Sequence, residues 1–227
     1  MDNIPTHVAV ILDGNRRWAK KHGKMSLDGH KMGMKNLISL TEHAFKRGIK
    51  VFSVYAFSTE NFSRSQEEVR YLMDLFIVNA KSNLERLIKN DIRVTFSGTS
   101  EGLTKKIKDV ISSLEEKSID NKSGIFNVCF NYGGRAEIVD ATKKILLDNV
   151  DVNDIDENVF QKYLYKDLPD VDLMIRPGGE CRLSNFLLWQ NSYAELYFSD
   201  VLFPDFNESE LDRALEEFNR RNRRFGG

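Results

Sequence analysis

Apolar residues along this chain gather into short runs, separated by longer stretches in which they recur with the period of a helix. The runs are too short for helices, and most are flanked by Gly, Asp or Asn, so we expect them to be strands. Near-continuous apolar content is typical of parallel strands that are covered on both faces. The predicted strands are residues 8–12, 51–57, 92–97, 126–132 and 171–175.

The stretches between these runs have amphipathic periodicity. In residues 66–89, for example, Val69, Leu72, Met73 and Phe76 fall on one face. Alternating strands and helices predict an α/β fold with a mostly parallel central sheet covered by helices. The predicted helices are residues 30–47, 66–89, 104–117, 135–147, 156–164 and 207–221.

Length and composition predict one domain, residues 1–227, because 227 residues with 41% hydrophobic content suffice for one sizeable core. A net charge of -1 gives no indication of a nucleic-acid partner. Cys129 and Cys181 lack CxxC spacing and no long apolar region opens the chain, so we expect a cytoplasmic protein. No run approaches the roughly 18 apolar residues that a membrane span needs.

The first apolar run ends in the segment Asp13-Gly14-Asn15-Arg16-Arg17-Trp18. The buried strand is thus followed, within about one helical turn, by a carboxylate, a glycine, an amide and two guanidinium groups. Ligands of open α/β sheets bind at the carboxyl ends of strands, and a helix beginning there points N–H groups at an anion. This chemistry suits a metal and diphosphate site. An Asp N-cap followed by solvated arginines is the alternative.

Polar residues follow three other predicted strands in the same way, at 58–64, 131–135 and 176–185. Since the ends of parallel strands meet at one edge, we expect a cleft there with several arginines around one carboxylate. Arginine suits bidentate recognition of phosphate oxygens, so one large or two smaller polyanions are implied. Each piece alone could be a turn or a structural ion pair. The arginines are Arg16, Arg17, Arg64, Arg176 and Arg182.

Several other kinds of site lack their motifs. The chain has no GxxxxGK[ST], GxGxxG, HExxH or DDxxD sequence, and its histidines lack zinc-site spacing. The acidic residues between 148 and 157 lack the glycine of an EF-hand loop, so we expect a solvated loop and a helix start. His30, after Gly29, is expected at a helix start, where it either contacts phosphate or caps the helix.

Long motifs in one order resemble the cis-prenyltransferases, within them the bacterial undecaprenyl diphosphate synthases. The resemblance runs from residue 7 to residue 227 and rests on HVAVILDGNRRWA, YAFSTENFSR, NYGGR, RPGGECRLSNFLLWQ and YAELYF. It implies a Mg²⁺-dependent enzyme that condenses isopentenyl diphosphate with an allylic diphosphate, such as farnesyl diphosphate. The implied product is a polyprenyl diphosphate such as undecaprenyl diphosphate.

The resemblance also implies roles for individual residues. Asp13 resembles the catalytic carboxylate that works with Mg²⁺, and Ser58 and Asn61 resemble groups near the reacting carbons, Asn61 being catalytic. Phe62, Arg64 and Glu68 match a mobile segment that closes over the substrates. Glu195 matches a second metal-associated carboxylate, near a subunit interface. The allylic diphosphate would be bound by Gly14, Asn15, Arg16, Arg17 and His30, and isopentenyl diphosphate by Arg176, Arg182 and Ser184, while Trp18 is a further substrate-binding candidate.

Further implications concern the assembly and the product. The segment YAELYF and Arg220 to Arg224 match a homodimer contact, and helix 66–89 with strands 51–57 and 92–97 would line an apolar tunnel. A lipid product implies transient contact with the inner face of the membrane.

The chain departs from the family at Ser26, where an arginine is common, and at Pro177, where Thr or Ser is common. The allylic diphosphate site therefore lacks one cation, unless Arg16 or Lys24 supplies the charge. Both departures leave open a specialised short-chain or irregular prenyl diphosphate synthase, and a non-catalytic partner subunit is a further alternative.

Overall fold

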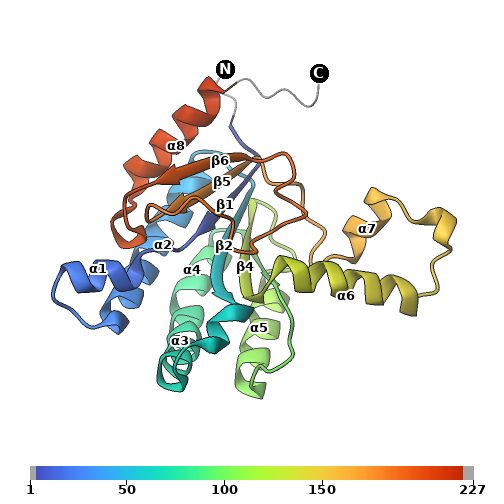
Figure 1. Ribbon diagram of the computed structural model, residues 1–227, viewed down its shortest axis with the longest axis horizontal. Helices are drawn as coiled ribbons and strands as arrows, with labels where there is room; N and C mark the ends of the chain where they lie inside the picture. The colour runs from blue at the N-terminus through green and yellow to red at the C-terminus, as the bar shows by residue number, and fades with distance from the viewer. Residues whose placement is uncertain (1–3, 222–227) are drawn as a thin grey trace.

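The computed structural model describes residues 4–221 and consists of a six-stranded parallel sheet with helices packed around it (Figure 1). Every strand pair is parallel, and the strand order is β3-β4-β2-β1-β5-β6. The sheet therefore brings the carboxyl ends of all its strands to one edge. The strands are β1 His7–Ile11, β2 Val51–Ser58, β3 Ile92–Ser97, β4 Gly124–Tyr132, β5 Leu173–Pro177 and β6 Glu195–Ser199.

Both faces of the sheet are buried, as the apolar runs predict. The larger core lies between one face and helices α2, α3, α4, α5 and α8, while the smaller one packs against Phe186 and Leu187. In Figure 1, α6 and α7 project from the body on one side. The α-helices are α1 Asn15–Lys21, α2 Ser26–Lys46, α3 Gln66–Asn79, α4 Glu85–Lys89, α5 Lys105–Ser118, α6 Gly134–Leu147, α7 Glu157–Tyr163 and α8 Glu208–Arg220.

Short helical turns complete the fold: η1 Thr59–Ser63, η3 Val152–Asp154 and η4 Phe203–Asp205 are 3₁₀ turns, and η2 Ala80–Leu84 is a π-helix. Because η2 joins α3 to α4 without a break, the predicted helix 66–89 is confirmed as one helical segment with a π-helical stretch inside it. Among the described residues, no helix is long and apolar enough to cross a membrane.

The predicted start of α2 is wrong. The sequence predicts a helix over residues 30–47, but α2 begins at Ser26, so His30 lies one turn inside it. The side chain of Asp28 accepts a hydrogen bond from the backbone N of Met25 at 3.2 Å and caps the helix four residues earlier. Gly29 lies inside the helix, and α1 packs so closely against it that a Cβ there would lie 2.0 Å from the carbonyl oxygen of Asn15.

A row of buried polar side chains crosses four strands on the face of the smaller core. His7 Nε2 lies 2.7 Å from Ser53 Oγ, and Asn127 Nδ2 donates to the same oxygen at 3.0 Å. Asn127 Oδ1 in turn accepts from Thr95 Oγ1 at 3.2 Å and from Ser97 Oγ at 2.9 Å. These contacts give each buried group a partner and link β1, β2, β4 and β3.

Candidate active site

A cavity of about 640 Å³ opens at the carboxyl edge of the sheet. Polar residues line its mouth: Asp13 after β1, Ser58 and Asn61 after β2, and Arg176 on β5. Its deeper wall is apolar and is formed by Phe57, Leu72, Leu75, Phe76 and Phe130. Helix α3 and strand β2 thus contribute to the wall as predicted, whereas no residue of β3 is among those that line it.

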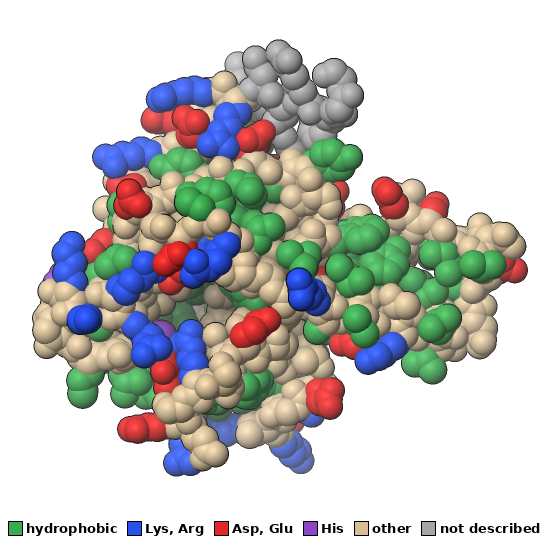
Figure 2. Space-filling view, viewed as in Figure 1, with side chains coloured by type: hydrophobic (Ala, Val, Ile, Leu, Met, Phe, Trp, Pro, Cys, Tyr) green, Lys and Arg blue, Asp and Glu red, His purple; other side chains and the backbone are tan. Residues whose placement is uncertain are grey.

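A second cavity, of about 890 Å³, adjoins the first and is strongly basic. The two share Leu12, Asp13, Asn15, His30 and Arg64. In Figure 2, Lys and Arg side chains crowd around a hollow on this face of the molecule. The cations that line the second cavity are Arg16, Arg17, Lys20, Lys24 and Arg64.

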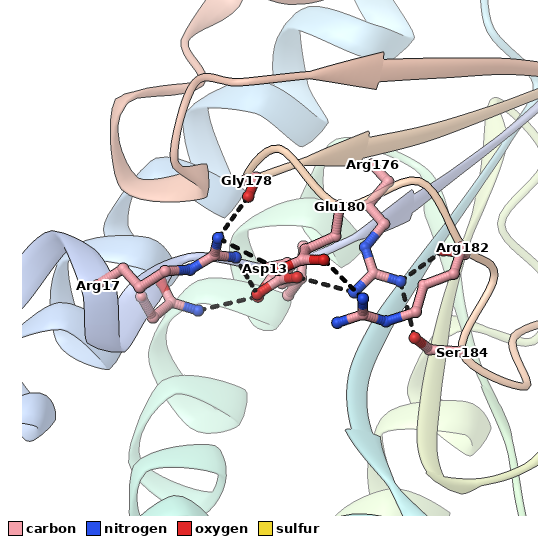
Figure 3. A network of polar contacts seen from close by, with 9 residues as sticks. Asp13, Arg17, Arg176, Gly178, Glu180, Arg182 and Ser184 are labelled. Carbon is pink, nitrogen blue, oxygen red and sulfur yellow. Dashed lines mark hydrogen bonds and ion pairs between the residues drawn. The ribbon is translucent and has the colours of Figure 1, made fainter.

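Asp13 lies between two guanidinium groups, as Figure 3 shows. Its Oδ2 accepts from Arg176 Nη2 at 2.8 Å, and its Oδ1 accepts from Arg17 Nη2 at 3.0 Å. Burial alone would raise the pKa of Asp13, but the hydrogen bonds and charges of Arg176 and Arg17 lower it on balance. Asp13 is therefore an ionised carboxylate, and its side chain is 27% exposed at the mouth of the cavity.

Arg176 organises the loop that follows β5. Its guanidinium is 4% exposed, and Nη1 donates to the carbonyl oxygen of Arg182 at 2.5 Å and to Ser184 Oγ at 2.7 Å (Figure 3). Its Nε is buried and has no hydrogen-bond partner within residues 4–221. A buried donor without a partner costs free energy, so an anionic oxygen is the natural ligand for it.

The turn after β1 depends on glycines for close approach. Gly14 has φ +104, and a Cβ there would lie 2.9 Å from Leu202 Cδ2, so a side chain is excluded twice over. In α2, a Cβ on Gly29 would lie 2.0 Å from the carbonyl oxygen of Asn15, and a Cβ on Gly33 would lie 2.1 Å from Asn15 Oδ1. Two glycines one turn apart thus let α2 contact the start of α1 directly.

Asn15 and His30 are oriented toward the cavities by these contacts. Asn15 Nδ2 donates to the carbonyl oxygen of Leu12 at 3.0 Å. Asn15 Oδ1 is buried and has no hydrogen-bond partner among the described residues, and the buried His30 Nε2 has only a long contact of 3.5 Å to Glu68 Oε1. Burial, followed by the charge of Arg64, lowers the pKa of His30, so this imidazole is neutral at pH 7. Both side chains remain able to bind a ligand.

The segment after β2 is tied to α3 and α2 through one carboxylate. Glu68 Oε1 accepts from Arg64 Nη1 at 2.8 Å and lies 3.5 Å from His30 Nε2. Asn61 Oδ1 accepts from the backbone N of Ser58 at 3.1 Å, which holds the turn η1 together. Phe62 is 43% exposed and lines neither cavity, but its ring packs edge-on against Phe57, which lines the first. Glu68 therefore positions Arg64 and lies beside His30, both of which line the cavities, but it does not line either cavity itself.

Trp18 and Glu195, both candidate site residues, line neither cavity. Trp18 is buried and donates from Nε1 to Asp205 Oδ1 at 2.7 Å, which fixes α1 to η4. Glu195 pairs with Arg221 Nη1 at 3.0 Å. It begins β6 opposite Leu173, which pairs with Val8, whereas Asp13 follows the far end of β1, so Glu195 lies at least roughly 10 Å before Asp13 along the strand direction.

The remaining candidates concern the end of the chain and a metal. Residues 222–227, including Arg223 and Arg224, lie outside the described residues. Within the described part of the chain, no cluster of three His, Cys, Asp or Glu side chains could hold a metal. Asp13 alone still fits Mg²⁺, which proteins commonly bind through one or two carboxylates together with substrate phosphates and water.

Glu60 and Asn185 line the first cavity and hydrogen-bond to each other, although the sequence assigns neither of them a role. Lys24, a candidate for the cation missing at Ser26, lines the second cavity. Glu60 and Asn185 do lie inside the long motifs, each beside a candidate residue. Their position next to the candidate residues Asn61 and Ser184 is the feature of the sequence that could have identified them.

Comparison with known proteins agrees with the geometry of the site. Residues 11–226 match a family model described as putative undecaprenyl diphosphate synthase. The chain is 50% identical over 225 residues to an isoprenyl transferase of Fusobacterium nucleatum, covering 99% of this chain and 97% of that protein. It is 45% identical over 231 residues to the ditrans,polycis-undecaprenyl-diphosphate synthase ((2E,6E)-farnesyl-diphosphate specific) of Pasteurella multocida, covering 100% and 96%.

A solved structure shares the whole fold. Lavandulyl diphosphate synthase from Lavandula x intermedia, in complex with dimethylallyl diphosphate, superposes with a TM-score of 0.95 at 38% identity, covering 99% of both chains. Similarity at this level over the full length shows that the two chains share one architecture. We conclude that the chain is a prenyltransferase and belongs to the undecaprenyl diphosphate synthase family.

Proposed function

We propose that this enzyme performs Mg²⁺-dependent cis-prenyl chain elongation. It condenses isopentenyl diphosphate with an allylic diphosphate, farnesyl diphosphate, and forms a polyprenyl diphosphate such as undecaprenyl diphosphate. One observation carries the proposal: a cavity with a charged mouth continues into an apolar wall between the sheet and α3. Such a cavity accommodates a diphosphate head and a hydrocarbon chain together. The farnesyl starter is the one named for the Pasteurella multocida relative.

The two diphosphates are assigned to the two sides of Asp13. The allylic diphosphate fits the basic cavity, where Gly14 to Arg17 and His30 surround it. Isopentenyl diphosphate fits the loop after β5, where Arg176, Arg182 and Ser184 line the first cavity. Guanidinium groups and backbone N–H groups on these two sides are preorganised donors for phosphate oxygens.

The reaction breaks the allylic C1–O bond, forms a C–C bond from the double bond of isopentenyl diphosphate to C1, and releases a proton to give a cis double bond. Diphosphate leaves readily only when its charge is neutralised, which the arginines of the site do directly. Asp13 would hold Mg²⁺ together with diphosphate oxygens, and the ion supplies further charge neutralisation when bound. The departing diphosphate suits the role of proton acceptor better than Asp13, whose lowered pKa makes it a weak base.

Product analysis tests this proposal. The protein is incubated with Mg²⁺, isopentenyl diphosphate and either farnesyl or geranyl diphosphate, and the products are measured by mass spectrometry. We expect a ladder of products that grow by one five-carbon unit and disappear with EDTA. If no allylic starter gives a product, the proposal is refuted and a non-catalytic partner subunit is favoured. The presence of the candidate site residues argues against such a subunit: Asp13, Asn15, Arg176, Arg182 and Ser184.

A second candidate is a specialised short-chain or irregular prenyl diphosphate synthase. The TM-score of 0.95 with lavandulyl diphosphate synthase favours it, as do Ser26 and Pro177. Ser26 lines the basic cavity, and Pro177 ends β5 beyond the last residue that pairs with β1. A ten-carbon product from dimethylallyl diphosphate alone would identify this activity and would distinguish it from chain elongation.

We further propose a homodimer that is cytoplasmic and touches the inner face of the membrane transiently during product release. Glu195 is too far from Asp13 within one chain to share an ion, so its metal role requires a second copy. Edge strand β6 and α8 flank a groove lined by Tyr197, Arg220 and Arg221. Sedimentation of a fully active monomer of 26.2 kDa would refute the dimer.

A further inference from the structure

Three segments around the first cavity meet at one side chain, that of Asn185. Its backbone carbonyl oxygen accepts from the N of Gly134 at 2.8 Å, and its Oδ1 accepts from the N of Arg135 at 2.9 Å. Its Nδ2 donates to Glu60 Oε1 at 2.8 Å. Asn185 therefore connects the loop after β5, the beginning of α6 and the turn η1.

The connection to α6 is the fixed part of this arrangement. The first N–H groups of a helix lack partners within the helix, and Asn185 satisfies two of them at α6. Its backbone is left-handed, with φ +64, a conformation that asparagine tolerates better than most residues. A Cβ on Gly133 would lie 2.9 Å from Asn185 Nδ2 and 2.8 Å from Thr59 Oγ1, so the absence of a side chain keeps the segments close.

The connection to η1 involves a charged acceptor. Burial tends to raise the pKa of Glu60, but the hydrogen bond from Asn185 contributes to lowering it on balance, so Glu60 is ionised. A hydrogen bond to an ionised group is stronger than a neutral one. Glu60 lies directly before Asn61 and Phe62, and Asn185 lies directly after Ser184. The bond thus links the proposed isopentenyl diphosphate loop to the segment placed beside the allylic substrate.

We propose that the hydrogen bond between Asn185 and Glu60 is a latch that couples binding of the two substrates. An isopentenyl diphosphate that orders the loop of Arg182 and Ser184 also holds Asn185 in place, and Asn185 then holds η1 against the cavity. Coupling of binding is reciprocal, so the allylic substrate should strengthen the binding of isopentenyl diphosphate by the same factor. The latch rests on the proposed function. Asn185 and Glu60 are positioning residues in it.

A pair of substitutions tests the latch by exchanging donor and acceptor. Asn185→Asp keeps the oxygen that accepts from Arg135 but places a carboxylate against Glu60. Glu60→Gln keeps an acceptor oxygen for Asn185. In the double variant, the amide of the new glutamine can donate to the new aspartate, so the bond is restored with its direction reversed. Asn149→Asp is the matched control, because Asn149 is exposed, has φ +53 and lies away from both cavities.

The measurement is the KM for the allylic substrate at several concentrations of isopentenyl diphosphate, together with kcat and Tm. In the unchanged protein, this KM should fall as isopentenyl diphosphate rises. We expect Asn185→Asp to remove that dependence and raise the KM at saturating isopentenyl diphosphate by roughly tenfold, and the double variant to restore it. Asn149→Asp should behave like the unchanged protein.

Each other outcome overturns a distinct claim. A Tm loss in Asn185→Asp with the dependence of KM intact would mean that the bond serves folding alone. A double variant no better than Asn185→Asp would show that the hydrogen bond itself is not what matters. Turnover of the unchanged protein separates the two proposals. If the unchanged protein makes no product, the proposed function is overturned. If it makes product but the double variant does not restore the dependence of KM on isopentenyl diphosphate, only the latch is overturned.

Discussion

His7 should make the stability of this protein depend on pH in a way that can be isolated experimentally. The imidazole is 1% exposed, with Nδ1 2.7 Å from the carbonyl oxygen of Pro169 and Nε2 2.7 Å from Ser53 Oγ. Burial lowers the pKa of His7 from 6.5 to about 4, although the carbonyl of Pro169 and the charge of Asp172 act in the opposite direction. His7 is therefore neutral in the folded protein at pH 7.

The direction of the effect follows from proton binding in the two states. Between pH 6.5 and about 4, the unfolded chain binds a proton on His7 that the folded protein does not. Stability is therefore lost as pH falls through this window, and the loss is complete below the folded pKa. A shift from 6.5 to about 4 corresponds to about 3 kcal/mol, since each pKa unit is worth roughly 1.4 kcal/mol.

Urea unfolding of the unchanged protein and of His7→Gln at pH 7, 6, 5 and 4 isolates this contribution, because the other titrating groups are common to both. At pH 7 the variant should be less stable, since it loses two buried hydrogen bonds. That difference should shrink by about 3 kcal/mol between pH 7 and pH 4. Thr41→Val, which removes a buried hydroxyl that does not titrate, should show a constant difference. A constant difference for His7→Gln would refute the reasoning.

Three further predictions concern the site. Asp13→Asn and Asp13→Ala should each lower kcat by at least roughly 10²-fold. Only the alanine variant should also lower Tm, because the amide oxygen of asparagine can still accept a hydrogen bond from the buried Arg176. Equal Tm values for the two variants would contradict this. Gly33→Ala should raise the allylic KM roughly tenfold by displacing Asn15, although alanine favours helices; an unchanged KM would show that Asn15 adjusts freely. Lys24→Met should raise the KM for the allylic substrate by roughly three- to tenfold at low salt, because a cation is lost from the basic cavity. Adding Ser26→Arg to Lys24→Met should lower this KM again if both cations serve one diphosphate. A double variant with a still higher KM would mean that the pocket is arranged differently.

The sheet and the location of the site follow from the sequence because buried parallel strands read as uninterrupted apolar runs. Asp13 and Arg176 could be placed at one edge for the same reason, although 162 residues lie between them in the sequence. Periodicity does not reveal β6, since Glu195–Ser199 is a half-buried edge strand of mixed polarity. Its pairing is set by β5 and not by its own pattern.

Contacts between distant segments explain the other differences. Gly29 resembles a helix boundary in sequence, but it lies inside α2 because Asn15 packs against it. Trp18 stands within the motif of candidate site residues, yet its hydrogen bond to Asp205 directs it away from both cavities. The bond between Glu60 and Asn185 spans 125 residues of sequence, and no local pattern encodes such a partner.

The position of β1 in the sheet has a consequence for how the enzyme is made in the cell. β1 is the first strand to leave the ribosome, yet one of its two neighbours, β5, begins at Leu173. At roughly 5–20 residues per second, β1 waits about 8 to 33 seconds for that neighbour. The backbone of Asp13 waits longer still, for the N–H of Phe203. Nascent chains should therefore expose one unpaired edge of β1 until most of the chain has been synthesised, and an open strand edge can pair with other chains and aggregate.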